Sequence, residues 1–233
     1  AIVDTGIQYT HPDLKDQIWT NTKEIPGNKI DDDGNGYIDD VHGINVLERD
    51  AQQKPTSEIM DQHGHGTHVA GIIGATHNNR LGVAGVASHV KLMGIRAVPS
   101  DADETDVDVI EAYLYAGKNG AKIINCSFGK DHNEGGLAVS EAIDYIGKNY
   151  GTLVVAAAGN NSSNIDLHPT YPASYTNKNL LVVASSDSSG NLSYFSNYGK
   201  TSVDVAAPGS AIFSTVTDNT YQSMSGTSMA SPV

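Results

Sequence analysis

Residues 137–160 have the sequence LAVSEAIDYIGKNYGTLVVAAAGN, in which an amphipathic segment leads into a short apolar run. Leu137, Ile143 and Ile146 recur at roughly helical spacing, which predicts a helix over the first part. The run at 152–158 is rich in β-branched and small residues and lacks polar alternation, which is typical of a strand buried on both faces. A helix that leads into a buried strand is the repeating unit of an α/β protein with a parallel sheet.

The same alternation continues along the rest of the chain. Apolar runs predict buried strands, and the segments between them predict helices, one of which carries Val107, Ile110 and Leu114 at helical spacing. The further strands are expected at 1–3, 90–98, 122–127 and 180–185, and the further helices at 67–76 and 106–120. The sequence therefore predicts a three-layer α/β fold, with a mostly parallel sheet covered by helices on both faces. Residues 17–62 are polar and irregular and are expected to form surface loops.

The composition indicates one acidic domain. The chain has 233 residues, of which 39% are hydrophobic, and this is enough for a single sizeable core. The formal net charge of −13 argues against a nucleic-acid-binding protein and is explained by solubility, by cation binding, or by both. The single cysteine, Cys126, excludes an intrachain disulfide and is expected to be a small core residue. No apolar run approaches the roughly 18 residues that a membrane span needs.

Four short motifs place a carboxylate, an imidazole, an amide and a hydroxyl among glycines and other small residues. They are IVDTG at 2–6, HGHGTHVAG at 63–71, AAAGN at 156–160 and GTSMASP at 226–232. These groups are the four parts that acyl transfer from an amide requires. The order Asp, His, Ser along the chain, and the motifs themselves, resemble those of the subtilisin-like serine proteases, and the resemblance extends from the first residues to the last.

The resemblance implies a subtilisin-like fold and an endopeptidase that hydrolyses peptide bonds through an acyl-enzyme intermediate. In this assignment Ser228 is the nucleophile, His65 the general base and Asp4 the carboxylate that orients His65. The side-chain amide of Asn160 and the main-chain N–H of Ser228, at the start of a helix, would bind the oxyanion. Simpler structural explanations exist for three of these residues, because turn aspartates, turn asparagines and helix-capping serines are common.

The resemblance also implies where substrate binds. Two segments match those that line the first specificity pocket of the family. The matching residues are Ser127, Phe128 and Gly129, and Ala157, Ala158 and Gly159. Protein or peptide substrates would bind there in extended form, added to the sheet edge as a strand. Asp166 is either an acid at the base of that pocket, which would select Lys or Arg, or a solvated loop acid.

The sequence DDDGNGYIDD at 31–40 predicts a site for structural Ca²⁺. Acidic and amide side chains alternate along it, with a glycine at the sharp turn, as in the first nine positions of an EF-hand-type loop. The expected ligands are Asp31, Asp33, Asn35, Asp39 and the carbonyl of Tyr37. His42 stands where such a loop has its bidentate glutamate, so Asp40 or another segment has to complete the site. An acidic turn without metal is the alternative.

A second calcium site is implied by the resemblance alone. The family's tight calcium site corresponds to Asp13, Asn79 and the carbonyls of His77, Leu81 and Val83. Without a metal, Asp13 would be a helix cap and Asn79 a turn residue.

Two other functions compete with the peptidase assignment. One is a catalytically silent, calcium-stabilised binding domain that has kept the fold, although all four catalytic positions are filled. The other is a zinc hydrolase built on His63, His65 and His68, since His-x-His-x-x-His can chelate zinc. Thr67 argues against zinc, because the metallo-β-lactamase-like hydrolases that use such a run have an aspartate there. His63 and His68 are instead expected to be structural.

The resemblance further implies an N-terminal prosegment and a secreted protein, because the family is usually made as an exported zymogen. No signal peptide is visible, but the chain starts at Ala1 rather than Met. Only three residues precede Asp4, and the helix expected at Ser228 ends at Val233 after about one and a half turns. Residues 1–233 are therefore expected to be a single peptidase catalytic domain, truncated at both ends.

Overall fold

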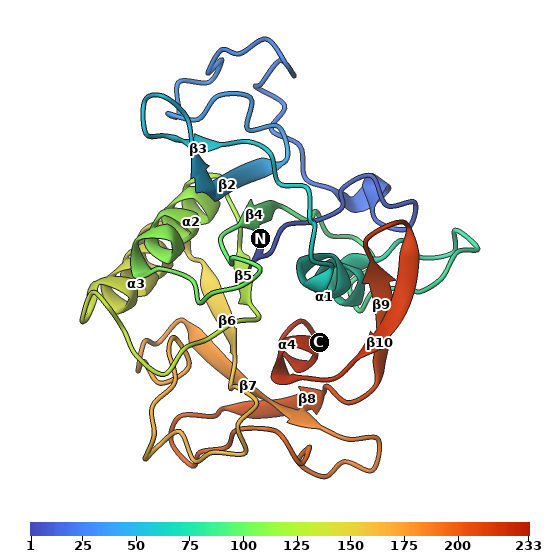
Figure 1. The fold of residues 1–233 in the computed structure, drawn as a ribbon, viewed down its shortest axis with the longest axis vertical. Coiled ribbons are helices and arrows are strands. Elements are labelled where there is room, and N and C mark those ends of the chain that lie inside the picture. The colour runs from blue at the N-terminus through green and yellow to red at the C-terminus, as the bar shows by residue number, and fades with distance from the viewer.

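A mostly parallel sheet runs through the centre of the computed structural model, which describes all of residues 1–233. Its strands are β1 (Ile2–Asp4), β2 (Gly43–Arg49), β3 (Pro55–Thr56), β4 (Gly94–Arg96), β5 (Ile123–Cys126), β6 (Leu153–Ala157), β7 (Leu180–Ser186) and β8 (Val205–Pro208). They lie in the order β3-β2-β4-β1-β5-β6-β7-β8, and every neighbouring pair is parallel except β2 and β3 (Figure 1). The predicted α/β class is confirmed.

The stretch 17–62, expected as surface loops, contains β2 and β3, so this part of the prediction was wrong. β2 lies between β3 and β4, with Ile44 and Val46 buried. Its apolar character is masked in the sequence by Asn45, which is also buried and whose side-chain oxygen accepts a hydrogen bond from the N–H of Leu47. A search for runs of apolar residues therefore misses a strand that carries a polar residue at a buried position.

Four α-helices cover the sheet, and a hairpin packs beside it. They are α1 (His65–Gly74), α2 (Asp106–Lys118), α3 (Ala138–Tyr150) and α4 (Thr227–Ala230), and the hairpin strands are β9 (Ile212–Val216) and β10 (Thr220–Met224). Helices α2 and α3 pack together on one face, and α1 and α4 lie on the other, with β9 against α1 (Figure 1). In β1, Val3 joins the core under α2 and α3, whereas Ile2 joins the core under α1. The sheet therefore separates two hydrophobic cores.

Helix α2 presents a different face to the core than its apolar spacing predicts. Val107 is 68% exposed and Leu114 is 37% exposed. The buried face carries Tyr113, Tyr115 and small residues instead. The Tyr115 hydroxyl donates to the buried carboxylate of Asp40 at 2.6 Å, which compensates for burial of its polar end.

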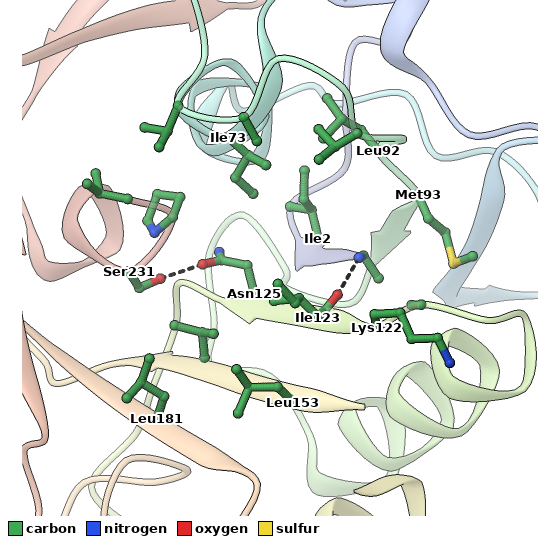
Figure 2. A pocket seen from close by; sticks show the side chains of 18 of the residues that line it. Ile2, Ile73, Leu92, Met93, Lys122, Ile123, Asn125, Leu153, Leu181 and Ser231 are labelled. Atoms are coloured by element: carbon green, nitrogen blue, oxygen red, sulfur yellow. Dashed lines mark hydrogen bonds between the residues drawn. The ribbon is translucent and has the colours of Figure 1, made fainter. Parts of the chain in front are cut away.

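An apolar groove of about 700 Å³ lies on the α1 and α4 side of the sheet, where the chain ends (Figure 2). Ile73 of α1, Leu153 of β6 and Leu181 of β7 line it, together with Val233. None of the residues expected to carry chemistry lines this groove. No helix combines the length and the apolar character that crossing a membrane would take.

Candidate active site

Asp4 and His65 meet where β1 ends and α1 begins. Asp4 is the last residue of β1 and is 1% exposed, and His65 is the first residue of α1. Nδ1 of His65 lies 2.7 Å from Oδ1 of Asp4, which also accepts a hydrogen bond from the main-chain N–H of Thr5. Since an ionised carboxylate can only accept, Nδ1 carries the ring proton. The imidazole can therefore accept a proton at Nε2.

The surroundings of His65 favour its protonated form. Burial lowers the pKa of the imidazole, but the charge and hydrogen bond of Asp4, with the charge of Asp61, outweigh burial and raise the pKa above its ordinary value. An imidazolium that forms during a reaction is thus stabilised by a buried carboxylate.

Glycines permit two close backbone contacts around the Asp4–His65 pair. A Cβ on Gly66 would lie 2.1 Å from the carbonyl oxygen of Gly6 and 3.1 Å from the carboxylate of Asp4. Gly6 has a φ of +116°, and a Cβ there would lie 2.5 Å from the carbonyl oxygen of Ile59. Gly66 is therefore required where α1 meets β1, and Gly6 where the turn after β1 meets residues 59–61.

The start of α4 holds Ser228 against the end of β5. The Ser228 hydroxyl donates to the carbonyl of Ser127 at 2.9 Å, and the Ser127 hydroxyl donates to the carbonyl of Ser228 at 2.8 Å. Helix α4 also contacts α1, where Met229 and Val69 belong to one core cluster. Ser228 and His65 therefore lie on two helices in contact, with the hydroxyl bonded to the main chain rather than to the imidazole.

The side chain of Asn160 is held by Thr227, the residue before Ser228. Its oxygen accepts hydrogen bonds from the main-chain N–H of Thr227 at 2.8 Å and from the Thr227 hydroxyl at 3.0 Å. A main-chain N–H can only donate, which assigns the facing atom as Oδ1 and leaves Nδ2 free to donate elsewhere. The hydroxyl of Thr227 in turn accepts from the N–H of Gly159 at 3.0 Å. Thr227 therefore fixes the orientation of the amide beside Ser228.

The two predicted substrate segments lie side by side, because β5 and β6 are neighbours in the sheet. Cγ2 of Thr170 lies 3.3 Å from the position that a Cβ on Gly129 would take, and 3.7 Å from that on Gly159. A polar hollow of about 490 Å³ opens beside Thr170. Its lining residues are Asp131, Asn161, Ser163, Leu167, His168, Pro169 and Thr170.

Three of the predicted substrate-binding side chains do not face this hollow. Ser127 is 3% exposed and Ala158 is fully buried, and neither residue lines the hollow. Phe128 packs against the core under α2 and α3.

Asp166 does not line the hollow. Its carboxylate accepts hydrogen bonds from the main-chain N–H groups of Lys200, Thr201 and Ser202 and from the Thr201 hydroxyl. Burial raises the pKa of Asp166, but these hydrogen bonds outweigh it and lower the pKa to about 2. The side chain is neither a pocket acid nor a freely solvated one, because it holds the loop 200–202.

The comparison with known proteins agrees with this geometry. The model of the subtilase family matches residues 1–233. The chain belongs to the subtilase family. It is 40% identical over 232 residues to the thermophilic serine proteinase of Bacillus sp. (strain AK1), covering 100% of this chain and 49% of that protein. It is 38% identical over 232 residues to thermitase of Thermoactinomyces vulgaris, covering 100% of this chain and 70% of thermitase.

Solved structures agree on the fold of this subtilase. A cold-adapted subtilisin-like serine proteinase superposes with a TM-score of 0.72 at 29% identity, covering 99% of this chain and 70% of that one. The epidermin leader peptide processing serine protease (EpiP) of Staphylococcus aureus superposes with a TM-score of 0.75 at 29% identity, and the match covers 100% of this chain and 62% of that one. Among curated relatives, this subtilase spans 49% of the Bacillus proteinase and 38% of subtilisin-like protease 1 of Plasmodium vivax.

One buried carboxylate beside His65, that of Asp61, was missed in the sequence. Asp61 is 4% exposed, and its carboxylate accepts hydrogen bonds from the Thr5 hydroxyl and from the main-chain N–H groups of Gly64 and Thr67 at the start of α1. Asp61 lies two residues before His63, and this spacing matches no motif that predicts a functional carboxylate. Its position beside His65 is seen only from the contacts in the folded structure.

The three motif histidines do not converge on one point. Nε2 of His68 lies 3.1 Å from the carbonyl of Ile212 and 3.0 Å from that of Gln222, so it carries a proton and is turned toward the hairpin. The rings of His63 and His65 are 6.4 Å apart between centroids, and Nδ1 of His65 is engaged by Asp4. The structure therefore gives no support to the zinc hydrolase, and His68 is structural as expected.

The acidic loop 31–40 of this subtilase gathers two of its predicted ligands around a third acid. One carboxylate oxygen from each of Glu24, Asp31 and Asp33 lies within 4.8 Å of the others. Burial raises the pKa of Glu24, and the charges of Asp40 and Asp32 add to this, while hydrogen bonds from the N–H groups of Asp33 and Asp32 oppose it. Glu24 was missed because it lies outside the loop in sequence.

The remaining predicted ligands of this loop are placed differently. The Asp39 side chain accepts from the N–H groups of Gly27 and Lys29 at 2.7 and 3.0 Å, so it caps a neighbouring turn and does not join the cluster. The Asn35 oxygen accepts from the N–H of Tyr37 at 2.8 Å. The carboxylate of Asp40 binds the hydroxyl of Tyr115 and two amides, and it does not complete the cluster either.

The second predicted calcium site is partly assembled. Asp13 is fully buried, and its carboxylate accepts from the Asn79 amide and from the N–H of Val83. The Asn79 oxygen accepts from the N–H of Leu81 at 3.0 Å. The His77 ring bonds the carbonyl of Gly85 at 2.6 Å. The loop 77–83 is thus folded around the carboxylate of Asp13.

Proposed function

We propose that this subtilase is a serine endopeptidase and that residues 1–233 form one peptidase catalytic domain. The observation that carries the proposal is the 2.7 Å hydrogen bond between Nδ1 of His65 and the buried carboxylate of Asp4. It orients the ring and leaves Nε2 as a proton acceptor on a helix that contacts the helix of Ser228. Pairing of a buried acid with an imidazole beside a serine is the arrangement that activates a hydroxyl nucleophile.

The reaction begins with attack of the Ser228 hydroxyl oxygen on the carbonyl carbon of a peptide bond. The hydroxyl proton passes to Nε2 of His65, and the carboxylate of Asp4 stabilises the imidazolium. As the tetrahedral intermediate collapses, His65 gives the proton to the leaving amine and the C–N bond breaks. Water then attacks the acyl-enzyme with His65 again as the base, which releases the acid and restores Ser228.

Two donors are proposed for the oxyanion of the tetrahedral intermediate. One is Nδ2 of Asn160, which is free because Oδ1 is engaged by Thr227. The other is the N–H of Ser228, since the first N–H groups of a helix have no partner within it. Fixed donors of this kind stabilise charge that develops only in the transition state.

The proposed substrates are proteins or peptides bound in extended form. The main chain at Ser127, Phe128 and Gly129, and at Ala157, Ala158 and Gly159, would pair with the substrate backbone. The polar hollow beside Thr170 would take the side chain next to the scissile bond, and its polar lining favours a side chain that forms hydrogen bonds. The net charge of −13 argues against nucleic acid as a partner.

Structural Ca²⁺ is proposed at two places and takes no part in the chemistry. Glu24, Asp31 and Asp33 would bind one ion, with Asn35 and the carbonyl of Tyr37 as further oxygen donors, and this all-oxygen set suits calcium. Asp13, Asn79 and the carbonyls of His77, Leu81 and Val83 would bind the second. The Asn79 amide would first have to turn, because its Nδ2 now faces Asp13. Both ions would tie surface loops to the core.

An N-terminal prosegment and secretion are proposed from family membership alone. Exported proteins without disulfides rely on other stabilisation, and bound calcium supplies it.

The test is labelling of the full-length protein with a fluorophosphonate probe in calcium, followed by peptide mapping. We expect the label on Ser228, and we expect Ser228→Ala to abolish both labelling and peptide hydrolysis while the fold stays intact. A folded, calcium-loaded protein freed of any prosegment that takes no label would instead be a catalytically silent binding domain.

A further inference from the structure

Asp61 is a second buried carboxylate at the candidate active site, and it binds no positively charged group. Its Oδ1 accepts from the hydroxyl of Thr5 at 3.0 Å and from the N–H groups of His63 and Gly64 at 2.9 and 3.0 Å. Its Oδ2 accepts from the N–H of Thr67 at 3.0 Å and from the hydroxyl of Thr67 at 2.6 Å. Five donors therefore converge on one side chain that is 4% exposed.

These donors come from both sides of the Asp4–His65 pair. Thr5 follows Asp4 directly, and its hydroxyl donates to Asp61 while it accepts from the N–H of Gly66 at 3.0 Å. Gly64 and Gly66 flank His65 in the chain. One carboxylate thus fixes the residue after Asp4 and the residues on either side of His65.

The location also places negative charge at the start of α1. The first N–H groups of a helix lack partners within it and carry a partial positive charge, which disfavours an imidazolium at that position. Asp61 accepts two of these N–H groups, at Gly64 and Thr67, and so offsets that effect. The titratable groups near the His65 ring are Asp4 on β1, Asp61, His63 in the preceding loop and His68 on α1, and α4 contributes the neutral Ser228.

We propose that Asp61 is a positioning residue for catalysis, which holds His65 in register with Asp4 and stabilises its protonated form. The proposal rests on the proposed peptidase function, because it assigns a role in that same reaction. Asp61 touches no reacting atom, and it acts through Thr5, Thr67 and the main chain around His65.

The informative variant is Asp61→Asn in the full-length protein. The amide keeps the size of the side chain and one accepting oxygen, but its NH₂ group cannot accept from Thr67. We expect kcat to fall about 10- to 100-fold, the loss that a small misplacement of a reacting group produces, while KM stays within about twofold. Loss of the negative charge also lowers the pKa of His65, so the acid limb of the kcat/KM profile should move to lower pH.

Asp166→Asn is the matched control. Asp166 also receives hydrogen bonds from several main-chain N–H groups and a hydroxyl, but all of them come from residues 200–202. Both substitutions should lower the unfolding temperature, whereas only Asp61→Asn should change kcat and the acid limb. If the two variants lose stability alike and keep the parental kcat and acid limb, Asp61 is merely structural and the proposal is overturned.

A second measurement separates this proposal from the peptidase function. The pKa of His65 is followed by NMR in Ser228→Ala protein with and without Asp61→Asn, which needs no turnover. A lower pKa with Asp61→Asn supports the proposal, and an unchanged pKa contradicts it, even if the parent hydrolyses nothing. If Asp61→Asn does not fold, Thr5→Val removes the bridge from Asp61 to Gly66, and the same loss of kcat at constant KM is expected.

Discussion

The side-chain oxygen of Asn160 accepts hydrogen bonds from both the main-chain N–H and the hydroxyl of Thr227, at 2.8 and 3.0 Å. Because Ser228 follows Thr227, the amide and the nucleophile are fixed to each other through a single residue. Turning the amide over would place its NH₂ group against the main-chain N–H of Thr227, so that two donors would face each other, and Nδ2 therefore keeps its direction before any substrate arrives.

Asn160→Ala should therefore lower kcat about 10²- to 10³-fold, which is the loss measured when the side-chain oxyanion donor is removed from subtilisin, a member of this family. KM should change little, because the lost bond forms only with the charged intermediate. Steady-state kinetics on a peptide ester and a peptide amide would check this. A rise in KM at constant kcat would mean that Asn160 binds the ground-state substrate instead.

Asp4→Asn should reduce kcat by about 10⁴-fold, because the amide can donate to the ring and favours the wrong tautomer of His65. The parent should lose activity as the pH falls through the pKa of His65, since the base must be neutral. That pKa is raised by Asp4, so the acid limb should lie above the ordinary value of 6.5. In Asp4→Asn the acid limb of the residual activity should move to lower pH. An acid limb at the parental pH would contradict the assignment of His65 as the titrating group.

Removal of calcium should lower the stability of the fold without altering the chemistry. A site with free calcium at 100 times its Kd contributes about 2.7 kcal/mol, so chelation should lower the unfolding temperature by several degrees. Glu24→Gln with Asp31→Asn should remove the part of the response that belongs to the acidic loop. Asp39→Asn is the control, because Asp39 caps a turn outside the cluster. An equal loss of calcium response in Asp39→Asn would contradict the ligand set.

Glu104 should make the fold less stable as the pH rises. Burial raises its pKa to about 7 from an ordinary value of 4.5, and the charge of Lys130 offsets this only in part. The folded protein thus holds the proton more tightly than the unfolded chain, so this contribution is complete below pH 4.5 and is lost as the pH rises through about 7. Glu104→Gln should flatten that dependence. Urea unfolding of Ser228→Ala protein at pH 5 and pH 8, with fixed calcium, would measure it.

The sequence alone was informative about the candidate site where short motifs place glycines and other small residues next to a functional side chain. Asp4 and His65 were predicted because their motifs resemble those of the family, and Gly66 of one motif leaves no room for a side chain against Gly6 of the other. Asn160 and Ser228 were predicted in the same way, from short motifs of small residues, and their catalytic roles are proposals. No sequence motif indicated which residues from distant segments come into contact. Glu24 joins Asp31 and Asp33 only after the chain folds back.

The strand β2 and the buried face of α2 were missed for a related reason. Asn45 and Tyr115 are polar or amphipathic and nevertheless buried. The Tyr115 hydroxyl donates to the distant Asp40, whereas the Asn45 oxygen accepts only from the nearby Leu47 and its Nδ2 has no partner. Val107 is apolar and nevertheless exposed. Apolar spacing alone cannot register a polar side chain whose partner lies elsewhere in the chain.

The central position of β1 has a consequence for how activity is lost. Asp4 ends a strand that is hydrogen-bonded to β4 on one side and β5 on the other. Amide hydrogens in such a strand exchange only when the whole domain opens. Heating should therefore leave the pairing of His65 with Asp4 intact until the global unfolding event.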